Sequence, residues 1–208
     1  MLELFIAVLA SLFSVVNPMG AVPVFLALTP SHTKAERNKT AFHTSLYFAL
    51  ILLTFFFAGT LILSFFGISI NAMRIAGGLV ILSSGYTLLS GNFTESRINK
   101  KVRNEALEKD DISFAPMAMP MLSGPGSISL LIGLYAENPL LEHRTVIAIV
   151  IVFLALIVYL ILKSAPYLYK LLGEAGLKAM TRIMGFIVMA IGVQYVIGGV
   201  VQLVTAMV

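Results

Sequence analysis

Two short segments with polar residues interrupt long apolar stretches of this sequence, and each is built around a proline. The first, SVVNPMGAVP at residues 14–23, lies inside the charge-free interval 4–33, and the second, SGPGSIS at residues 123–129, lies inside the charge-free interval 112–136. Proline lacks a backbone N–H and disfavours helical geometry in the residue before it, and glycine adopts backbone conformations closed to other residues. A helix that contains either segment should therefore break there.

A broken helix of this kind offers binding groups, and a pair of breaks suits a small zwitterion. The half-helix that restarts after each break would present N–H groups and the positive end of its dipole to an anionic group. The carbonyl groups released before each break, near Val16 and near Ser123, could coordinate an ammonium group or Na+. The candidate substrate-binding residues are Ser14, Asn17, Pro18, Gly20, Pro23, Ser123, Gly124, Pro125, Gly126, Ser127 and Ser129. For each break the alternative is a simple proline kink whose polar groups are satisfied by neighbouring hydroxyls.

Four further side chains are candidates for gating or for lining a cavity. Arg74 and Arg182 lie at the ends of the third and sixth expected spans, where they could pair with a substrate carboxylate or with the opposite half of the protein. Their alternative role is to anchor helix ends at the membrane interface. Tyr86 and Gln194 lie deep in the same two spans and could equally form hydrogen bonds inside the helix bundle.

The expected spans contain few side chains that could take part in acid–base chemistry or bind a metal ion. No Asp, Glu, Lys or Arg falls in the middle of a span, so the carboxylate relay of many proton-coupled carriers is not visible. His43, near the start of the second span, is either a proton carrier or an interfacial residue. Na+ is therefore the simpler coupling ion, and H+ is the alternative. We expect no metal site formed by side chains and no cofactor. The sequence also lacks cysteine, an HExxH motif and a P-loop, which argues against an intramembrane enzyme and an ATP-driven pump.

The composition indicates that these segments belong to an integral membrane protein. Of 208 residues, 59% are hydrophobic and 12% are charged, whereas average soluble domains have about half and a quarter. Six charge-free intervals are long enough for a transmembrane helix, which needs about 20 apolar residues. The expected spans cover about 4–29, 41–66, 71–91, 113–135, 145–166 and 181–205, within a single membrane domain of residues 1–208. The lipid bilayer is thus the expected partner, and nucleic acid is not.

The basic residues are distributed unevenly over the loops between these spans. Twelve of the 14 Lys and Arg residues fall on one side of a six-span chain. Basic loops are cytoplasmic by the positive-inside rule, so both termini are expected outside. The charged segment 92–112 is then a solvated cytoplasmic connector, and a regulatory or partner-binding segment is the alternative.

The two halves of the chain resemble each other. The Arg, Ile and Gly residues of RIAGG, which starts at Arg74, recur in RIMGF, which starts at Arg182, with an offset of 108, while Pro18 and Pro125 differ by 107. A repeat of three spans enters the membrane in the opposite direction the second time, as in many secondary transporters. The sequence therefore predicts two inverted three-helix repeats, residues 1–91 and 113–208, in which helices 1 and 4 are broken at mid-membrane. Convergent apolar composition is the alternative.

Two motifs in these segments resemble the signatures of a known family. NPMGAVPVF at residues 17–25 is similar to the NPxGxxPxF signature of the MarC family, also called the small neutral amino acid transporter family, and PMLSGPGSIS at residues 120–129 is similar to its PxxxxPGxIS signature. The resemblance implies a six-span protein of the bacterial or archaeal cytoplasmic (inner) membrane. For some members it implies transport of glycine, alanine and related neutral amino acids. The family's other label, multiple antibiotic resistance, is weak support for drug export.

The leading functional hypothesis is a secondary carrier that moves a small neutral amino acid by alternating access around the paired breaks. An exporter of another small solute, a channel and a non-transporting membrane subunit are the alternatives. The direction of transport stays open, and a homo-oligomer is compatible with the sequence.

Overall fold

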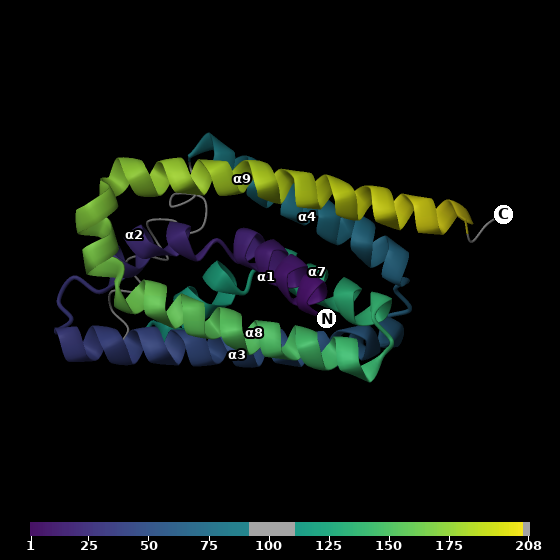
Figure 1. Cartoon of the computed structure of the whole chain (residues 1–208), viewed down its shortest axis with the longest axis horizontal. Coiled ribbons are helices and arrows are strands. Elements are labelled where there is room, and N and C mark those ends of the chain that lie inside the picture. The colour runs from purple at the N-terminus through teal and green to yellow at the C-terminus, as the bar shows by residue number, and fades with distance from the viewer. Residues whose placement is uncertain (92–110, 206–208) are drawn as a thin grey trace.

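The computed structural model describes residues 1–91 and 111–205, and the regular structure within these ranges is helical throughout (Figure 1). The elements are α1 (Leu2–Val16), α2 (Pro18–Leu28), α3 (Lys34–Phe65), α4 (Ile70–Ser90), η1 (Ser113–Leu122), α7 (Pro125–Glu137), α8 (Leu141–Lys163) and α9 (Ala165–Thr205). The all-helical prediction is confirmed for these residues. Most of the expected cytoplasmic connector, residues 92–110, lies outside the described ranges.

Several of these helices are long and apolar enough to cross a membrane. There are five such stretches among the described residues, or six if η1 and α7 together form one bent span. The first stretch, Leu2–Leu28, contains both α1 and α2. The helices therefore provide the five or six spans of a multi-pass membrane protein.

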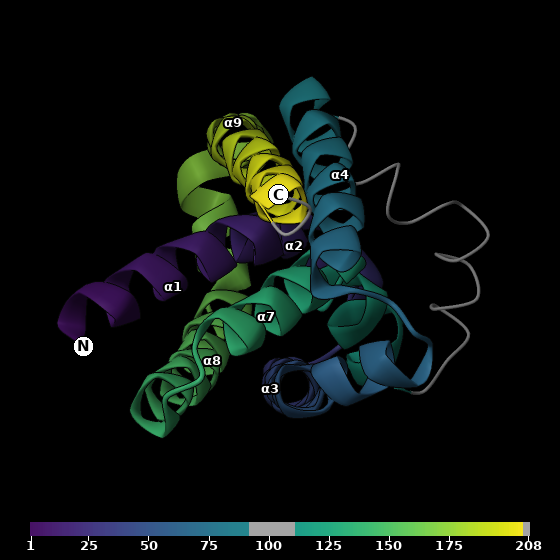
Figure 2. The same ribbon diagram turned by 90° about the vertical axis from the view of Figure 1, so that its right-hand side faces the viewer.

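Two pairs of long helices flank the interrupted ones. α3 runs beside α8, and α4 runs beside α9, with α1, α2 and α7 between the two pairs (Figures 1 and 2). In Figure 1 α1 begins between the middle of the molecule and the end at which α9 finishes. Helices of the first half pack mainly against helices of the second half, as α3 does against α8, α7 and η1. The core is therefore built between the two halves of the chain.

The start of α3 lies further upstream than the expected span. The helix begins at Lys34 instead of near residue 41. Thr33 caps it, because its hydroxyl oxygen accepts from the Glu36 N–H at 3.3 Å while the Glu36 carboxylate accepts from the Thr33 N–H at 2.7 Å. Such a capping box satisfies two backbone donors that a helix start leaves unpaired, so the helix continues beyond the apolar interval.

The last helix is also longer than the expected span. α9 begins at Ala165, so the stretch between the expected spans 145–166 and 181–205 is helical as well. Gly173 interrupts this helix with a φ of 64°, a conformation that glycine adopts without steric cost. Just beyond it, Lys178 pairs with Glu174 one turn away at 2.7 Å, which supports the helix after the break.

The pair α4 and α9 is held at close range by glycines. A Cβ atom added to Gly78 would lie 2.8 Å from the Gly192 carbonyl oxygen, and one added to Gly85 would lie 2.9 Å from the Gly185 carbonyl oxygen. Only residues without a side chain fit at these points. Such small residues let helix backbones approach each other in a membrane, where van der Waals packing drives association.

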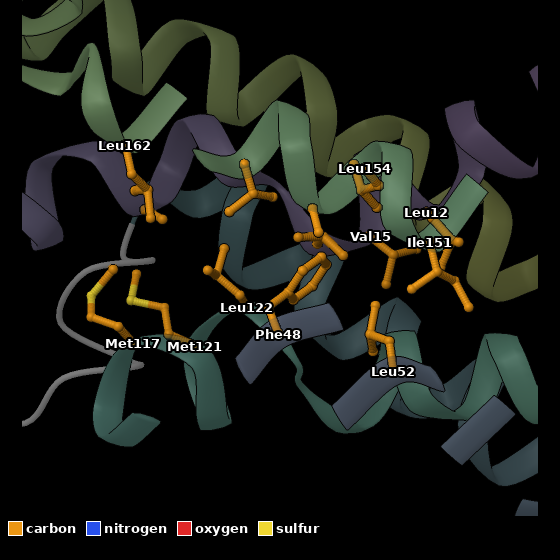
Figure 3. Packing of buried hydrophobic residues seen from close by; sticks show 14 of the residues in the cluster. Leu12, Val15, Phe48, Leu52, Met117, Met121, Leu122, Ile151, Leu154 and Leu162 are labelled. Atoms are coloured by element: carbon orange, nitrogen blue, oxygen red, sulfur yellow. The ribbon is translucent and has the colours of Figure 1, made fainter. Parts of the chain in front are cut away.

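The largest apolar cluster fills the space between α3, α8 and the interrupted helices. Figure 3 shows Phe48 and Leu52 of α3 near Ile151 and Leu154 of α8, with Leu12 of α1 beside them. All five side chains are fully buried. This packing fixes the interrupted helices from one side, while the α4 and α9 pair covers them from the other.

Candidate functional site

The first interruption is a single residue, Asn17. It separates α1 from α2 and adopts the left-handed conformation, with φ 49° and ψ 63°. Its N–H donates to the Phe13 carbonyl at 2.9 Å, and its carbonyl accepts from the Gly20 N–H at 3.1 Å. Asparagine is one of the few residues other than glycine that visits this conformation routinely. Pro18 then opens α2 at a position where a helix has no use for the missing N–H.

The second interruption separates η1 from α7, and the chain bends there by 65°. α7 opens with Pro125, as α2 opens with Pro18. Gly124, the residue before it, is extended, with φ −77° and ψ 167°, which any residue adopts. The expectation that glycine at this break adopts a conformation closed to other residues is therefore wrong for Gly124. Proline itself explains the geometry, because it pushes the preceding residue out of the helical region.

The segment before the second break differs from a regular half-helix. η1 contains two residues with extended backbone angles, Ala115 and Met119, each of which precedes a proline. The expected span 113–135 is therefore regular only from Pro125 onward.

The two interruptions lie close together. A Cβ atom on Gly126, at the start of α7, would lie 3.5 Å from Cγ1 of Val15, at the end of α1, and 3.2 Å from Cγ1 of Ile81 in α4. A side chain at Gly126 would therefore be tight against Ile81 of α4 and in ordinary contact with Val15 of α1. The first turn of α7 consequently packs beside the last turn of α1.

Polar side chains at both interruptions are buried, and within residues 1–91 and 111–205 they have no hydrogen-bond partner. Asn17 is 1% exposed, and neither its side-chain oxygen nor its side-chain nitrogen has a partner. Ser123 is also 1% exposed, and its hydroxyl has none. Leaving a buried polar group unsatisfied costs about 1–3 kcal/mol. An amide that can donate and accept, and a hydroxyl, are therefore available to a ligand that reaches the breaks.

Three other predicted serines are satisfied internally. Ser14 donates to the Ala10 carbonyl at 2.8 Å, and Ser127 donates to the Gly124 carbonyl at 2.9 Å. Ser129 donates to the Met73 sulfur at 2.9 Å. The hydroxyls of Ser14 and Ser127 therefore bind to carbonyls one turn away in their own segments, and that of Ser129 links α7 to α4.

The remaining predicted residues of the breaks differ in burial. Pro18 and Gly20 are buried in the first turn of α2, and Pro23 is half-buried within that helix. Gly124 is buried, whereas Pro125 is exposed.

A cavity of about 610 Å³ lies between α1, α7 and α9. Its lining comes from the first half of α1, the last half of α7 and the middle of α9: Leu4, Ala7, Val8, Ser11, Leu130, Leu134, Glu137, Asn138, Ile187, Ala190, Ile191, Gln194 and Tyr195. The Tyr195 hydroxyl donates to the Leu130 carbonyl at 2.8 Å and so ties α9 to α7.

The four predicted gating or cavity-lining residues lie in different environments. Gln194 lines the cavity. Tyr86 is 64% exposed and does not line it, because the glycines of α4 form the buried side of that helix. Arg74 is 4% exposed and forms an ion pair with Glu137 at the end of α7. Arg182 is exposed.

The two arginines differ in burial, and the glycines between α4 and α9 fit another offset than the arginines do. The glycines that pack α4 against α9 match at an offset of 107, Gly78 with Gly185 and Gly85 with Gly192, as the two prolines do. In this register Arg74 corresponds to Thr181, which is also buried. The offset of 108 that equates Arg74 with Arg182 is one residue out of this register.

Glu137 is the functional candidate that sequence reasoning missed. Its charge marked the end of the interval 112–136 and so the edge of a span. Because α7 is a half-helix, its end at Glu137 packs against α4 and lines the cavity. A carboxylate that directly follows a broken helix is the signal that could have found it.

Other titratable groups form no recognisable centre. His43 is half-buried between the rings of Phe42 and Tyr47, at centroid distances of 5.9 and 6.4 Å. Within the described ranges, no group of three or more His, Cys, Asp or Glu side chains is placed to hold a metal ion.

Comparison with known proteins gives one consistent result. The family model described as "MarC family integral membrane protein" matches residues 2–204. The UPF0056 membrane protein MJ1677 of Methanocaldococcus jannaschii is 40% identical over 199 residues, which cover 96% of this chain and 97% of the relative. The UPF0056 membrane protein YhcE of Escherichia coli is 35% identical, and the match covers 91% of this chain and 88% of the relative. The UPF0056 inner membrane protein MarC of Salmonella typhimurium is 34% identical and covers 98% of both chains. No solved structure matches.

Proposed function

The chain belongs to the MarC family of integral membrane proteins, and we propose that it is a secondary transporter that carries small neutral amino acids by alternating access around its two helix interruptions. The observation that carries this proposal is the pair of buried, unpartnered polar side chains at those interruptions, Asn17 and Ser123. The family predicted from the two motifs is confirmed, whereas the cargo is an inference from chemistry.

The chemistry of the two breaks suits a zwitterion. α2 and α7 both begin at the breaks, so their first N–H groups and positive dipole ends favour a carboxylate. The amide oxygen of Asn17 and the hydroxyl of Ser123 are acceptors for an ammonium group. We infer a small side chain for the cargo from the close packing at the start of α7, where a Cβ on Gly126 would lie 3.2 Å from Cγ1 of Ile81.

Inverted repeats are the architecture that we propose for this transport. The contacts between α4 and α9 are reciprocal: Gly78 meets Gly192, and Gly85 meets Gly185. With equivalent residues 107 apart, each of these contacts is the symmetry mate of the other, as a two-fold axis requires. The packing of α2 against α9 likewise has its mate in the packing of α7 against α4. In this arrangement the two breaks lie at mid-membrane, where the repeats move against each other.

The membrane and topology follow from the charge distribution and from the relatives. We propose the cytoplasmic (inner) membrane, since the Salmonella relative is described as an inner membrane protein. The basic loops lie inside and both termini outside, as the positive-inside rule predicts from the uneven distribution of Lys and Arg.

The coupling ion and assembly are part of the same proposal. Na+ at backbone carbonyls near Val16 and Ser123 is the preferred coupling ion, and H+ is the alternative. The proposed transporter works without a cofactor, is not an enzyme, and can act as a homo-oligomer or as a single chain.

Transport by purified protein in proteoliposomes tests the proposal. Radiolabelled alanine should enter in a saturable manner and exchange against internal unlabelled alanine. Asn17→Gly should abolish uptake, because it removes the amide and keeps a residue suited to the left-handed conformation. Asn38→Ala is the matched control, since Asn38 lies in α3 away from the breaks. A flux that never saturates would indicate a channel, and saturable exchange of a different solute only would indicate another cargo.

A further inference from the structure

The cavity between α1, α7 and α9 contains one carboxylate. Among the described residues that line it, Glu137 is the one charged side chain, and Ser11, Asn138, Gln194 and Tyr195 are the polar ones. The Glu137 side chain is 40% exposed. A carboxylate in a mostly apolar cavity attracts a cationic group, because the low-dielectric walls strengthen its field.

Glu137 already has an internal partner, the Arg74 guanidinium. The pair joins the end of α7 to the second turn of α4, and thus one half of the chain to the other. Arg74 is buried behind Glu137 and does not itself line the cavity, and among the described residues its Nε has no hydrogen-bond partner. A buried guanidinium deprived of its counter-ion is strongly destabilising, so whatever replaces Arg74 at Glu137 must also supply an anion for Arg74.

We propose that this cavity is a first binding site for the transported solute, in which Glu137 binds the ammonium group and Arg74 binds the carboxylate. The inference rests on the proposed function for its cargo. It adds a second site, which is lined by the first half of α1 and the last half of α7 and is separate from the breaks. A zwitterion replaces both members of the internal ion pair at once. An amine without a carboxylate leaves Arg74 uncompensated, and a carboxylate without an ammonium group leaves Glu137 uncompensated.

This exchange also couples binding to movement. While Glu137 pairs with Arg74, the end of α7 is tied to α4. A zwitterion that takes both partners replaces this direct tie, so the conformation in which α7 has moved away from α4 binds the solute more tightly. A ligand shifts an equilibrium through such a difference in affinity between two states.

Binding to the purified full-length protein tests the site with three probes. Titration calorimetry should detect L-alanine, which carries both groups, and much weaker binding of alaninamide and of lactate, which carry one each. Glu137→Gln should weaken alanine binding by at least about tenfold. Glu142→Gln is the matched control: Glu142 is exposed at the start of α8 and does not line the cavity.

A second variant separates recognition from a structural role. Arg74→Gln removes the internal competitor, so alaninamide should bind at least about tenfold more tightly than to the wild type. If the ion pair were only structural, alaninamide would bind to Arg74→Gln no more tightly than to the wild type. The double variant Arg74→Gln/Glu137→Gln, which has no unpaired charge, should bind alanine no better than Glu137→Gln and should lose the gain in alaninamide binding; it keeps the test valid if Glu137→Gln fails to fold.

The outcomes distinguish the site from the proposed function. Wild-type affinity for alanine in the Glu137→Gln or double variant would overturn the site and leave alanine transport standing. Absence of binding by all three probes in the wild type and in Arg74→Gln would also overturn it. Binding of alaninamide to Arg74→Gln that depends on Glu137, in a protein that takes up no amino acid into proteoliposomes, would support the site and exclude the cargo.

Discussion

At the scale of single residues, Asn17 combines a backbone role with a side-chain role. Its left-handed backbone ends α1 and lets α2 begin at the next residue, and its buried amide has no partner within the described structure. These two roles are separable, because glycine supplies the first without the second.

Asn17→Ala should therefore be less stable than Asn17→Gly. Alanine in the left-handed conformation costs about 1–2 kcal/mol, which glycine avoids. Thermal unfolding of both variants in detergent, followed by circular dichroism, measures the difference. An alanine variant at least as stable as the glycine variant would show that Asn17 is not held in this conformation.

The chemistry of the candidate site was only partly predictable from residue types. Proline and asparagine mark the first interruption because their backbone preferences are local, and such preferences can be recognised in the sequence. The hydroxyls of Ser14 and Ser127 donate to their own helix, a choice that depends on the rotamer and not on the sequence motif. The pairing of Glu137 with Arg74 depends on how α7 packs on α4, which no spacing along the chain encodes.

At the scale of elements, the interrupted helices depend on the rigid pairs around them. α4 and α9 approach each other closely enough that the Gly192 position has no space for a methyl group: its Cβ would lie 2.6 Å from the Leu82 backbone nitrogen. Backbone atoms cannot swing aside as a side chain can. The spacing of α4 and α9 is thus fixed by glycine, and it determines where α2 and α7 can pack.

Gly192→Ala should destabilise the protein by about 1–3 kcal/mol, because overpacking forces two helix backbones apart. Gly198→Ala is the matched control in the same helix, since a Cβ there meets nothing within 4 Å. The control should unfold at the same temperature as the wild type or higher, given the better helix propensity of alanine. Equal melting temperatures for the two variants in detergent would contradict the close packing of α4 on α9.

The sequence predicted the presence of the helices better than it predicted the residues at which they begin and end. Charge-free intervals located the apolar part of each span, but α3 starts earlier because of a capping box, and α9 continues through a stretch expected to be a connector. Apolar composition reports what a bilayer requires, whereas capping and ion pairs decide how far a helix extends into water.

At the scale of the whole molecule, the two halves form one core. α3 packs against α8, η1 and α7, and α4 packs against α9 and α7, so each half lacks its main packing partners without the other. The single membrane domain predicted from the sequence is consistent with this packing.

Cleavage of the chain between residues 92 and 110 should therefore leave two halves that remain together. A protease site placed in this segment, followed by digestion in detergent and affinity capture through a C-terminal tag, measures the association. The halves should copurify in equal amounts, whereas either half expressed alone should be degraded. Two halves that separate after cleavage would show that each packs mainly on itself.

The topology can be tested by labelling, because the sequence contains no cysteine. Glu3→Cys and Lys170→Cys introduce single thiols at exposed positions, which the positive-inside rule places on opposite sides of the membrane. A membrane-impermeant maleimide should label position 3 in intact cells and position 170 only after the membrane is permeabilised. The reverse pattern would place both termini inside.

The packing between halves also has a consequence during synthesis. The ribosome releases α1 to α4 into the membrane before α7, α8 and α9 exist, so the first half has few of its final neighbours while the rest is translated. At about 5–20 residues per second, this interval lasts roughly 5–20 seconds. Glu137 follows Arg74 by 63 residues, so for roughly 3–13 seconds at this rate the buried Arg74 of α4 has no Glu137 to pair with. Nascent chains should thus depend on the insertion machinery or on lipid headgroups to shield that charge until the second half arrives.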